Sequence, residues 1–144
     1  MKTELPPDIS FHPAPRLMVY RPRGILTEDR LVSVVEFLEK VEDQASQPFH
    51  RFTDLSKLDA LDIEFKSIIR LSLHRRLTYG QHTPIKSAFY VTSPAAARVV
   101  RVHVLLTDHS PLVVKMFEEL PPVAKWLDVS INLLQAEGAP TNGG

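Results

Sequence analysis

The chain has 144 residues, with 17 Lys and Arg against 17 Asp and Glu, and it has no cysteine. A chain of this length forms one domain and buries roughly 70% of its unfolded surface, so it needs no disulfide or metal to fold. The absence of cysteine excludes disulfides, zinc–thiolate centres and thiol catalysis, and the zero net charge argues against non-specific nucleic-acid binding. Zero net charge also lowers the barrier to self-association, so a homodimer is compatible with this composition.

The sequence leads to two expectations, one about location and one about its ends. The start lacks the apolar core of a signal peptide, and no stretch reaches the ~18 apolar residues of a membrane span. We therefore expect a cytoplasmic protein without a membrane span. Gly and Pro are frequent at the other end. The predicted division is an N-terminal edge strand or arm at 1–14, a folded domain at 15–135 and a flexible tail at 136–144.

Two short strands and a helix are predicted first. Ile9 and Phe11 share one face of a strand, which the neighbouring prolines place at a sheet edge. The second strand is 17–20. Thr27 is a suitable helix cap, and apolar residues then recur at helical spacing over 31–41. This periodicity predicts a long amphipathic helix.

The next predicted elements are a buried strand at 49–55 and a helix that Asp62 caps and Gly80 ends. The helix is expected to turn four residues inward: Phe65, Ile68, Ile69 and Ser72. A core strand follows at 84–91, and another is expected at 112–117. The final predicted helix begins at the Pro121-Pro122 pair, with Val123, Trp126 and Leu127 packing inward.

The segment 95–106 carries two conflicting patterns. Ser93-Pro94 is a helix-start signature and three alanines follow it, whereas Val100, Val102 and Val104 alternate with polar residues as in a strand. We favour a helix, because a parallel sheet needs a crossover at this point. The resulting order is β β α β α β α β α. It predicts an α/β domain with a mixed, mostly parallel sheet of about five strands and about four helices.

In this order of elements the chain resembles the STAS-type family, the anti-sigma-factor antagonists and their relatives. It is most similar to the bacterial branch described as STAS-like or CRAL-TRIO-like. The resemblance rests on 24–27 before the first helix, on Asp54-Leu55-Ser56 after a core strand, and on Phe117 followed by Ala124, Trp126 and Leu127. It spans about residues 15–130 and implies a curved sheet with helices packed mainly on one face.

The resemblance also bears on regulation by phosphorylation. In the anti-sigma-factor antagonists the loop after Asp-Leu-Ser carries an aspartate and then a phosphorylatable serine at the start of the next helix. Asp62 matches the aspartate, but Ile63 and Glu64 stand in place of the serine. The resemblance therefore implies a member without the phospho-acceptor. Glu64 is either a permanent negative charge in the place of the phosphate or a carboxylate that suits the helix dipole.

The loop 54–62 is the first candidate site, because ligands of α/β sheets bind at the carboxyl ends of strands. It gathers three carboxylates and a hydroxyl, which suit a metal ion or acid–base chemistry. The alternative, which we favour, is that Asp54 and Ser56 satisfy loop backbone groups while Asp62 caps the helix. The predicted recognition edge consists of Asp54, Ser56, Asp59, Asp62, Glu64, Lys66 and Arg70.

Basic side chains on the same helix form the second candidate site. They could meet a phosphate, an acidic partner or an anionic surface, and the residues in question are Arg70, His74, Arg75 and Arg76. The alternative is a solvated helix face. The six histidines are scattered without a paired ligand spacing, so no metal site is predicted, and no phosphate-binding glycine motif or other cofactor signature is present.

Three functions remain open. The leading hypothesis is a non-enzymatic regulatory module that binds a protein partner through the recognition edge, so charge reversal at Glu64, Lys66 or Arg70 should weaken binding. The alternative is a carrier of a small apolar ligand or lipid, held between the sheet and the apolar residues of 65–77 and 99–106. The third is an enzyme using Asp54, Asp59 and Asp62, which would have to converge in a cleft.

Overall fold

The computed structural model describes residues 6–45, 47–80 and 82–135, and the predicted tail at 136–144 lies outside these ranges. Every helix and strand predicted from the sequence is present, and three further short elements are found: the strands β3 and β5 and the helix α5. The elements in chain order are β1 (Ile9–His12), β2 (Leu17–Tyr20), β3 (Gly24–Thr27), α1 (Glu28–Gln44), β4 (His50–Asp54), β5 (Leu58–Asp62), α2 (Phe65–Thr78), β6 (Ile85–Tyr90), α3 (Pro94–Leu106), β7 (Leu112–Phe117), α4 (Leu120–Leu127) and α5 (Ile131–Gln135).

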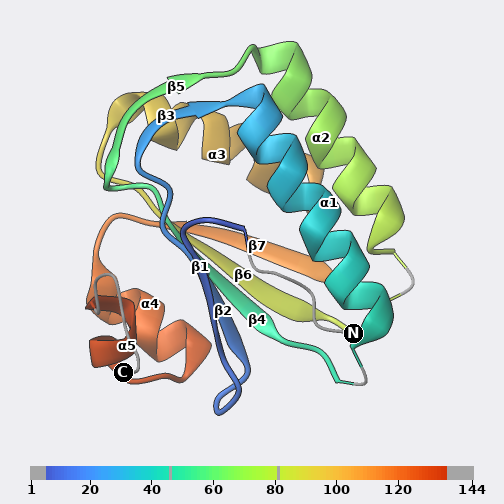
Figure 1. Cartoon of the computed structure of the whole chain (residues 1–144), viewed down its shortest axis with the longest axis vertical. Helices are drawn as coiled ribbons and strands as arrows, with labels where there is room; N and C mark the ends of the chain where they lie inside the picture. The colour runs from blue at the N-terminus through green and yellow to red at the C-terminus, as the bar shows by residue number, and fades with distance from the viewer. Residues whose placement is uncertain (1–5, 46, 81, 136–144) are drawn as a thin grey trace.

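Five strands form the main sheet in the order β1-β2-β4-β6-β7 (Figure 1). β1 runs antiparallel to β2 at one edge, and the other four strands are parallel. Parallel neighbours need a crossover, and α1, α2 and α3 supply one each between consecutive parallel strands. The predicted mixed, mostly parallel sheet of about five strands is confirmed. The carboxyl ends of β2, β4, β6 and β7 therefore meet at one edge.

Helices cover both faces of this sheet. α1, α2 and α3 lie on one side, and the short helices α4 and α5 lie on the other (Figure 1). The alternation of β2 shows the division, because Leu17 and Val19 pack with the residues of α4 and α5 while Met18 and Tyr20 pack with α1. Three helices on one face agree with the prediction. The position of α4 and α5 differs from the prediction, because the apolar side of α4 packs against the opposite face of the sheet.

The ambiguous segment at 95–106 is helical. The hydroxyl of Ser93 accepts a hydrogen bond from the N–H of Ala96 at 3.2 Å, and Pro94 occupies the first turn. Ala97 and Val100 are buried on the inner side of α3. The start signal therefore outweighs the strand-like alternation, and the predicted helix is confirmed. Thr27 likewise caps α1.

The two strands missing from the prediction pair with each other. β3 and β5 form a separate parallel ladder in which Thr27 is opposite Asp62. Gly24 begins β3 with a φ of 71°, a conformation that side-chain-bearing residues rarely adopt. β5 is a strand in the middle of what the sequence predicted as a loop over 54–62, so that prediction is wrong. In this short strand, Leu58 and Leu61 are the residues that pack against the core, so its sequence carries little hydrophobic pattern.

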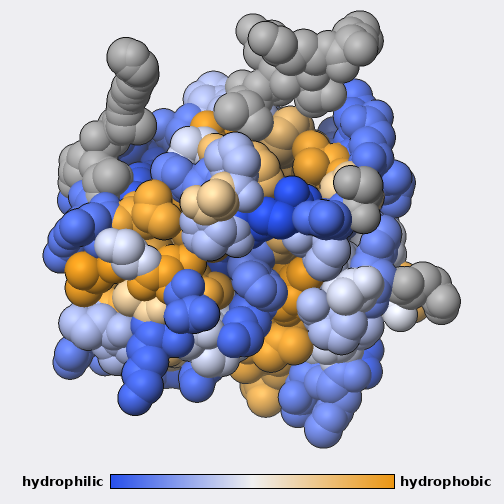
Figure 2. All heavy atoms as spheres, turned by 90° about the horizontal axis from the view of Figure 1, so that it is seen from below, coloured by the Kyte–Doolittle hydropathy of each residue, from blue (hydrophilic) through white to orange (hydrophobic). Residues whose placement is uncertain are grey.

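Apolar and hydrophilic areas alternate on the face of the molecule that lies below the view of Figure 1. Figure 2 shows one face, on which orange apolar patches are separated by blue hydrophilic ones. No helix within residues 6–45, 47–80 and 82–135 is both long enough and apolar enough to cross a membrane.

Candidate functional site

Asp54 and Ser56 hold the carboxyl end of β4 together. Asp54 is 4% exposed, and its Oδ1 accepts hydrogen bonds from the N–H and Oγ–H of Ser56 at 2.9 and 2.6 Å. Its Oδ2 accepts from Arg21 Nη1 at 3.2 Å. Arg21 also donates to the carbonyls of Leu133 and Leu134 at 2.9 and 2.7 Å. Asp54 therefore satisfies a backbone group of the turn, as the favoured alternative predicted, and it ties α5 to the sheet. Because it is buried, its inclusion in the predicted recognition edge is wrong.

We expect Arg21→Met to release α5. The change removes charge-assisted hydrogen bonds to two carbonyls and leaves a buried carboxylate without that cation, a loss of about 2–4 kcal/mol in unfolding free energy. Urea unfolding measures the loss, and hydrogen exchange should show faster exchange of the α5 amides. Arg98→Met, at an exposed position of α3, is the control. Unchanged hydrogen exchange of the α5 amides would contradict the role of Arg21 in holding α5 to the sheet.

The other carboxylates of the predicted edge lie apart from Asp54. Asp59 and Asp62 are exposed on β5. Pairing with β3 keeps the chain extended through Asp62, so the N-cap of α2 is Glu64 and the predicted cap at Asp62 is wrong. The Glu64 side chain makes no capping hydrogen bond and lies 3.6 Å from Lys66 Nζ in an exposed pair. A partner-binding role for Asp59, Asp62, Glu64 and Lys66 remains a prediction.

Basic side chains of α2 already have partners on α1. Arg70 Nη2 lies 3.2 Å from Glu28 Oε2, and His74 Nε2 lies 2.7 Å from Glu39 Oε2. The hydroxyl of Ser67 also donates to Glu28 at 2.6 Å. The carboxylates that balance this basic run come from another helix, which the sequence of α2 could not reveal. Arg70 and His74 thus join α2 to α1.

Arg76 joins α2 to the other neighbouring helix. Its Nη1 donates to the carbonyls of Leu106 and Asp108 at 3.2 and 2.5 Å, at the end of α3. These carbonyls lie at and just beyond a helix C-terminus, where a cation is favoured. Arg70, His74 and Arg76 all have partners within the protein. Nothing in these contacts tests an anion-binding role for them, and that role stays a prediction.

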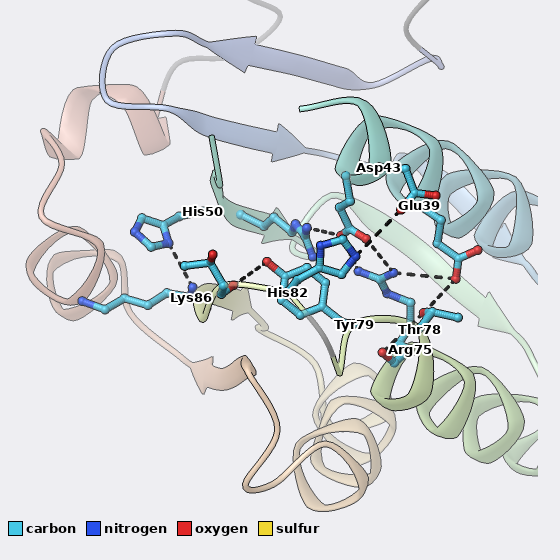
Figure 3. A network of polar contacts seen from close by, with 11 residues as sticks. Glu39, Asp43, His50, Arg75, Thr78, Tyr79, His82 and Lys86 are labelled. Atoms are coloured by element: carbon cyan, nitrogen blue, oxygen red, sulfur yellow. Dashed lines mark hydrogen bonds and ion pairs between the residues drawn. The ribbon is translucent and has the colours of Figure 1, made fainter. Parts of the chain in front are cut away.

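Arg75 belongs to a buried ionic triad. Glu42 on α1 accepts hydrogen bonds from Arg51 Nη2 on β4 and from Arg75 Nη1 and Nη2 at 3.1 and 2.6 Å. Each of the three is at most 9% exposed, and Figure 3 shows Arg75 reaching from α2 toward α1. The predicted place of Arg75 on an exposed anion-binding face is therefore wrong.

Aromatic rings enclose Arg51 in this triad. Its guanidinium lies 5.0 Å from the ring centre of Phe49 and 5.4 Å from that of Tyr79. Burial lowers the pKa of Arg51 to about 10, so the side chain is charged at neutral pH. Its Nε has no hydrogen-bond partner among the described residues. The cluster thus contains a buried donor that no residue of the described ranges pairs.

The outer face of α2 carries an apolar stripe. Phe65, Ile69, Leu73 and Leu77 are 48%, 42%, 44% and 79% exposed. They recur every four residues, so they lie along one side of the helix. The prediction that Phe65 and Ile69 face the core is wrong, while Ile68 is buried as expected. We call these four residues the α2 stripe.

A cavity of about 130 Å³ lies on the opposite side of α2, between the helices and the main sheet. Residues of α1, α2, α3 and the central strands line it. At its polar end Ser72 Oγ and His103 Nδ1 share a hydrogen bond of 2.8 Å. Burial, with a smaller contribution from the charge of Arg75, lowers the pKa of His103 to about 4. His103 is therefore neutral at pH 7.

The remaining histidines do not assemble into a metal site. Within the described part of the chain, no three side chains of His, Asp or Glu are placed to hold one ion. His50 Nδ1 accepts a hydrogen bond from the N–H of Lys86 at 2.9 Å, a contact visible in Figure 3. Burial, followed by the charges of Lys86 and Arg51, lowers the pKa of His50, which suits this acceptor role.

Comparison with known proteins bears on the fold. Among solved structures, the chain is similar to an uncharacterised protein of the DUF3478 family from Shewanella loihica PV-4, which is described as having a SpoIIAA-like fold. The match covers 88% of this chain and 98% of the other, with a TM-score of 0.54 at 17% sequence identity. This chain has a SpoIIAA-like fold. The STAS-type architecture expected from the sequence is thereby confirmed. Neither a family model nor a curated protein matches the chain.

Two features of this SpoIIAA-like fold were not recognised in the sequence as sites. The α2 stripe had a signal, the four-residue spacing from Phe65 to Leu77, but that spacing equally describes a buried helix face. The cavity also had a signal, because Thr53 and Ser87 are polar residues inside strands predicted to be core. Whether such residues leave a hollow depends on the helices above them, which only the structure supplies.

Proposed function

We propose that the chain is a non-enzymatic interaction module of the regulatory kind and that it binds a protein partner through the outer face of α2. The α2 stripe carries this proposal. An exposed row of four large apolar side chains on one helix costs solubility unless another surface covers it. Helices that bind in this way place apolar anchors one turn apart into a groove of the partner.

The contacts around the stripe support a rigid recognition helix. Arg70 and His74 hold α2 to α1, and Arg76 holds it to α3. Because these polar groups are used internally, the exposed face between them is left to Phe65, Ile69, Leu73 and Leu77. A prepositioned helix loses little conformational entropy on binding, which favours affinity. The partner we infer offers an apolar groove rather than a row of carboxylates.

The other two candidate functions have less support. A lipid carrier needs a cavity of roughly 300 Å³ or more, and the one under α2 is about 130 Å³. An enzyme using Asp54, Asp59 and Asp62 needs these carboxylates to converge. Asp54 is buried in its pair with Arg21, while Asp59 and Asp62 are exposed on β5. This dispersion supports a non-enzymatic role.

The test is site-specific photo-crosslinking in the native host. A photoreactive residue at Leu73 should capture one defined partner, and the same residue at Val113, which is 44% exposed on β7, should not. Leu73→Glu should weaken the isolated complex at least tenfold, because interface anchors of this kind are worth about 2 kcal/mol or more. The melting temperature should stay close to that of the wild type, since Leu73 is an exposed side chain.

Two results would count against the proposal. One is identical capture from Leu73 and Val113, which would indicate non-specific contact. The other is a partner complex whose affinity Leu73→Glu leaves unchanged, which would place the interface elsewhere. A crosslink between two copies of the chain would identify the partner as a second copy, and sedimentation equilibrium of the wild type and of Leu73→Glu would then show the dimer and its loss.

A further inference from the structure

Small polar side chains stand at the centre of the main sheet, where a parallel sheet covered on both faces ordinarily carries Val, Ile or Leu. Thr53 on β4 and Ser87 on β6 line the cavity beneath α1, α2 and α3. Arg51, the residue opposite Ser87 in the ladder, lies beside them. The side chains of Thr53 and Ser87 are too short to fill this space, and the guanidinium of Arg51 is bonded to Glu42. A hollow of about 130 Å³ therefore remains. Apart from Ser72, Arg75 and His103, its other walls are apolar and include Val34, Ile68, Val99 and Val100.

Three polar groups beside this cavity have no hydrogen-bond partner among the described residues. Two are the hydroxyls of Thr53 and Ser87, which line the hollow. The third, Arg51 Nε, is the only fully buried side-chain nitrogen or oxygen left unpaired in the described part of the chain. Buried polar groups are nearly always hydrogen-bonded, and leaving one unpaired is costly. An N–H of a guanidinium can only donate, and a hydroxyl can also donate. The groups together call for a molecule that brings acceptor atoms.

The charge of the surroundings decides which acceptor fits. The buried triad contains two cations, Arg51 and Arg75, and one anion, Glu42. Glu39, 3.7 Å from Arg75, is the next carboxylate and lies at the outer, partly exposed end. The triad thus carries one net positive charge, which Glu39 offsets only from the partly exposed side. His103, which also lines the cavity, is neutral and adds no charge. A carboxylate placed at Arg51 would be paired and hydrogen-bonded, the two conditions for burying an ion.

We propose that this cavity is a binding site for a compact monocarboxylate, with its carboxylate at Arg51, Thr53 and Ser87 and its apolar body between Ile68 and Val100. A cavity of about 150 Å³ lined by apolar side chains holds a benzene molecule. The volume here therefore limits the whole ligand, carboxylate included, to at most about nine non-hydrogen atoms, the size of one aromatic ring or a short branched chain bearing the carboxylate. The site is separate from the α2 stripe, and the proposal does not depend on a protein partner.

Benzoate is the probe, titrated by calorimetry into the full chain. We expect a Kd between about 10 µM and 1 mM, the range open to so small a ligand. At a hundredfold excess over Kd, the melting temperature should rise by roughly 5–10 °C. Thr53→Val keeps the volume and removes a hydroxyl, so it should weaken binding about tenfold. Ser87→Val removes the other hydroxyl and fills the hollow, so it should abolish binding. Thr92→Val, at an exposed position, is the control and should bind as the wild type does.

Four outcomes would overturn the proposal. The first is that neither benzoate nor cyclohexanecarboxylate binds the wild type in calorimetry, and the second is that they bind Ser87→Val and the wild type equally. The third is that benzyl alcohol binds as tightly as benzoate, which would refute a carboxylate subsite. Should Ser87→Val not fold, the wild type alone decides, because bound benzoate must show nuclear Overhauser contacts to methyl groups of Val34, Ile68 and Val100. Contacts to surface methyl groups only would also refute the site.

Discussion

Replacing Glu42 by Gln should lower the unfolding free energy by about 3–5 kcal/mol. The change leaves Arg51 and Arg75 facing each other in the interior without the carboxylate that both bind. An arginine guanidinium cannot readily give up its proton in a protein, so the two positive charges would stay buried side by side. Urea unfolding measures the loss, and a drop in melting temperature of about 10 °C or more should accompany it.

The order of effects among variants distinguishes the triad from general packing. Arg75→Met leaves the pair of Arg51 and Glu42 intact, so it should cost less than Glu42→Gln. Glu36→Gln makes the same chemical change at an exposed position of the same helix and should stay within about 0.5 kcal/mol of the wild type. An equal loss for Glu42→Gln and Arg75→Met would show that buried volume, and not charge balance, dominates.

The fold was predictable where hydrophobic period and start signals agreed. The helices α1 and α3 follow from the caps at Thr27 and Ser93, and both caps make the expected hydrogen bond. Local signals failed where pairing with a distant segment decides the structure. β5 is a strand only because β3 lies beside it, and that pairing holds the chain extended past the predicted cap at Asp62.

The candidate site was harder to predict, for a related reason. The sequence of α2 shows its basic run but not the carboxylates of Glu28 and Glu39, which α1 brings from some forty residues earlier. Local spacing also leaves the rotation of α2 open. A rotation that buries Arg75 at the triad turns Leu73 and Leu77 to the surface. One long-range interaction therefore decides both the interior and the exposed face of this helix.

The second large effect concerns pH. We expect the unfolding free energy to rise between pH 4 and 6.5, because the unfolded chain protonates His103 near its usual pKa of 6.5 while burial lowers the pKa in the folded state to about 4. In this window the unfolded state binds more protons, so acid favours unfolding. The contribution of His103 to the unfolding free energy is fully present above pH 6.5. It is lost as the pH falls toward 4 and amounts to about 3 kcal/mol.

His103→Gln isolates this contribution, because it keeps a polar side chain near Ser72 and removes the titration. Urea unfolding of both proteins between pH 4 and 7 gives the slopes, and the variant should show a clearly smaller one. Some slope will remain, since burial lowers the pKa of His12 and His50 too. His109→Gln, at a side chain that is 88% exposed, should leave the wild-type slope intact. Equal slopes for His103→Gln and the wild type would mean that His103 takes up its proton without unfolding. The interface of α2 and α3 would then have to open to water in acid, which hydrogen exchange over Ser72 and His103 would detect.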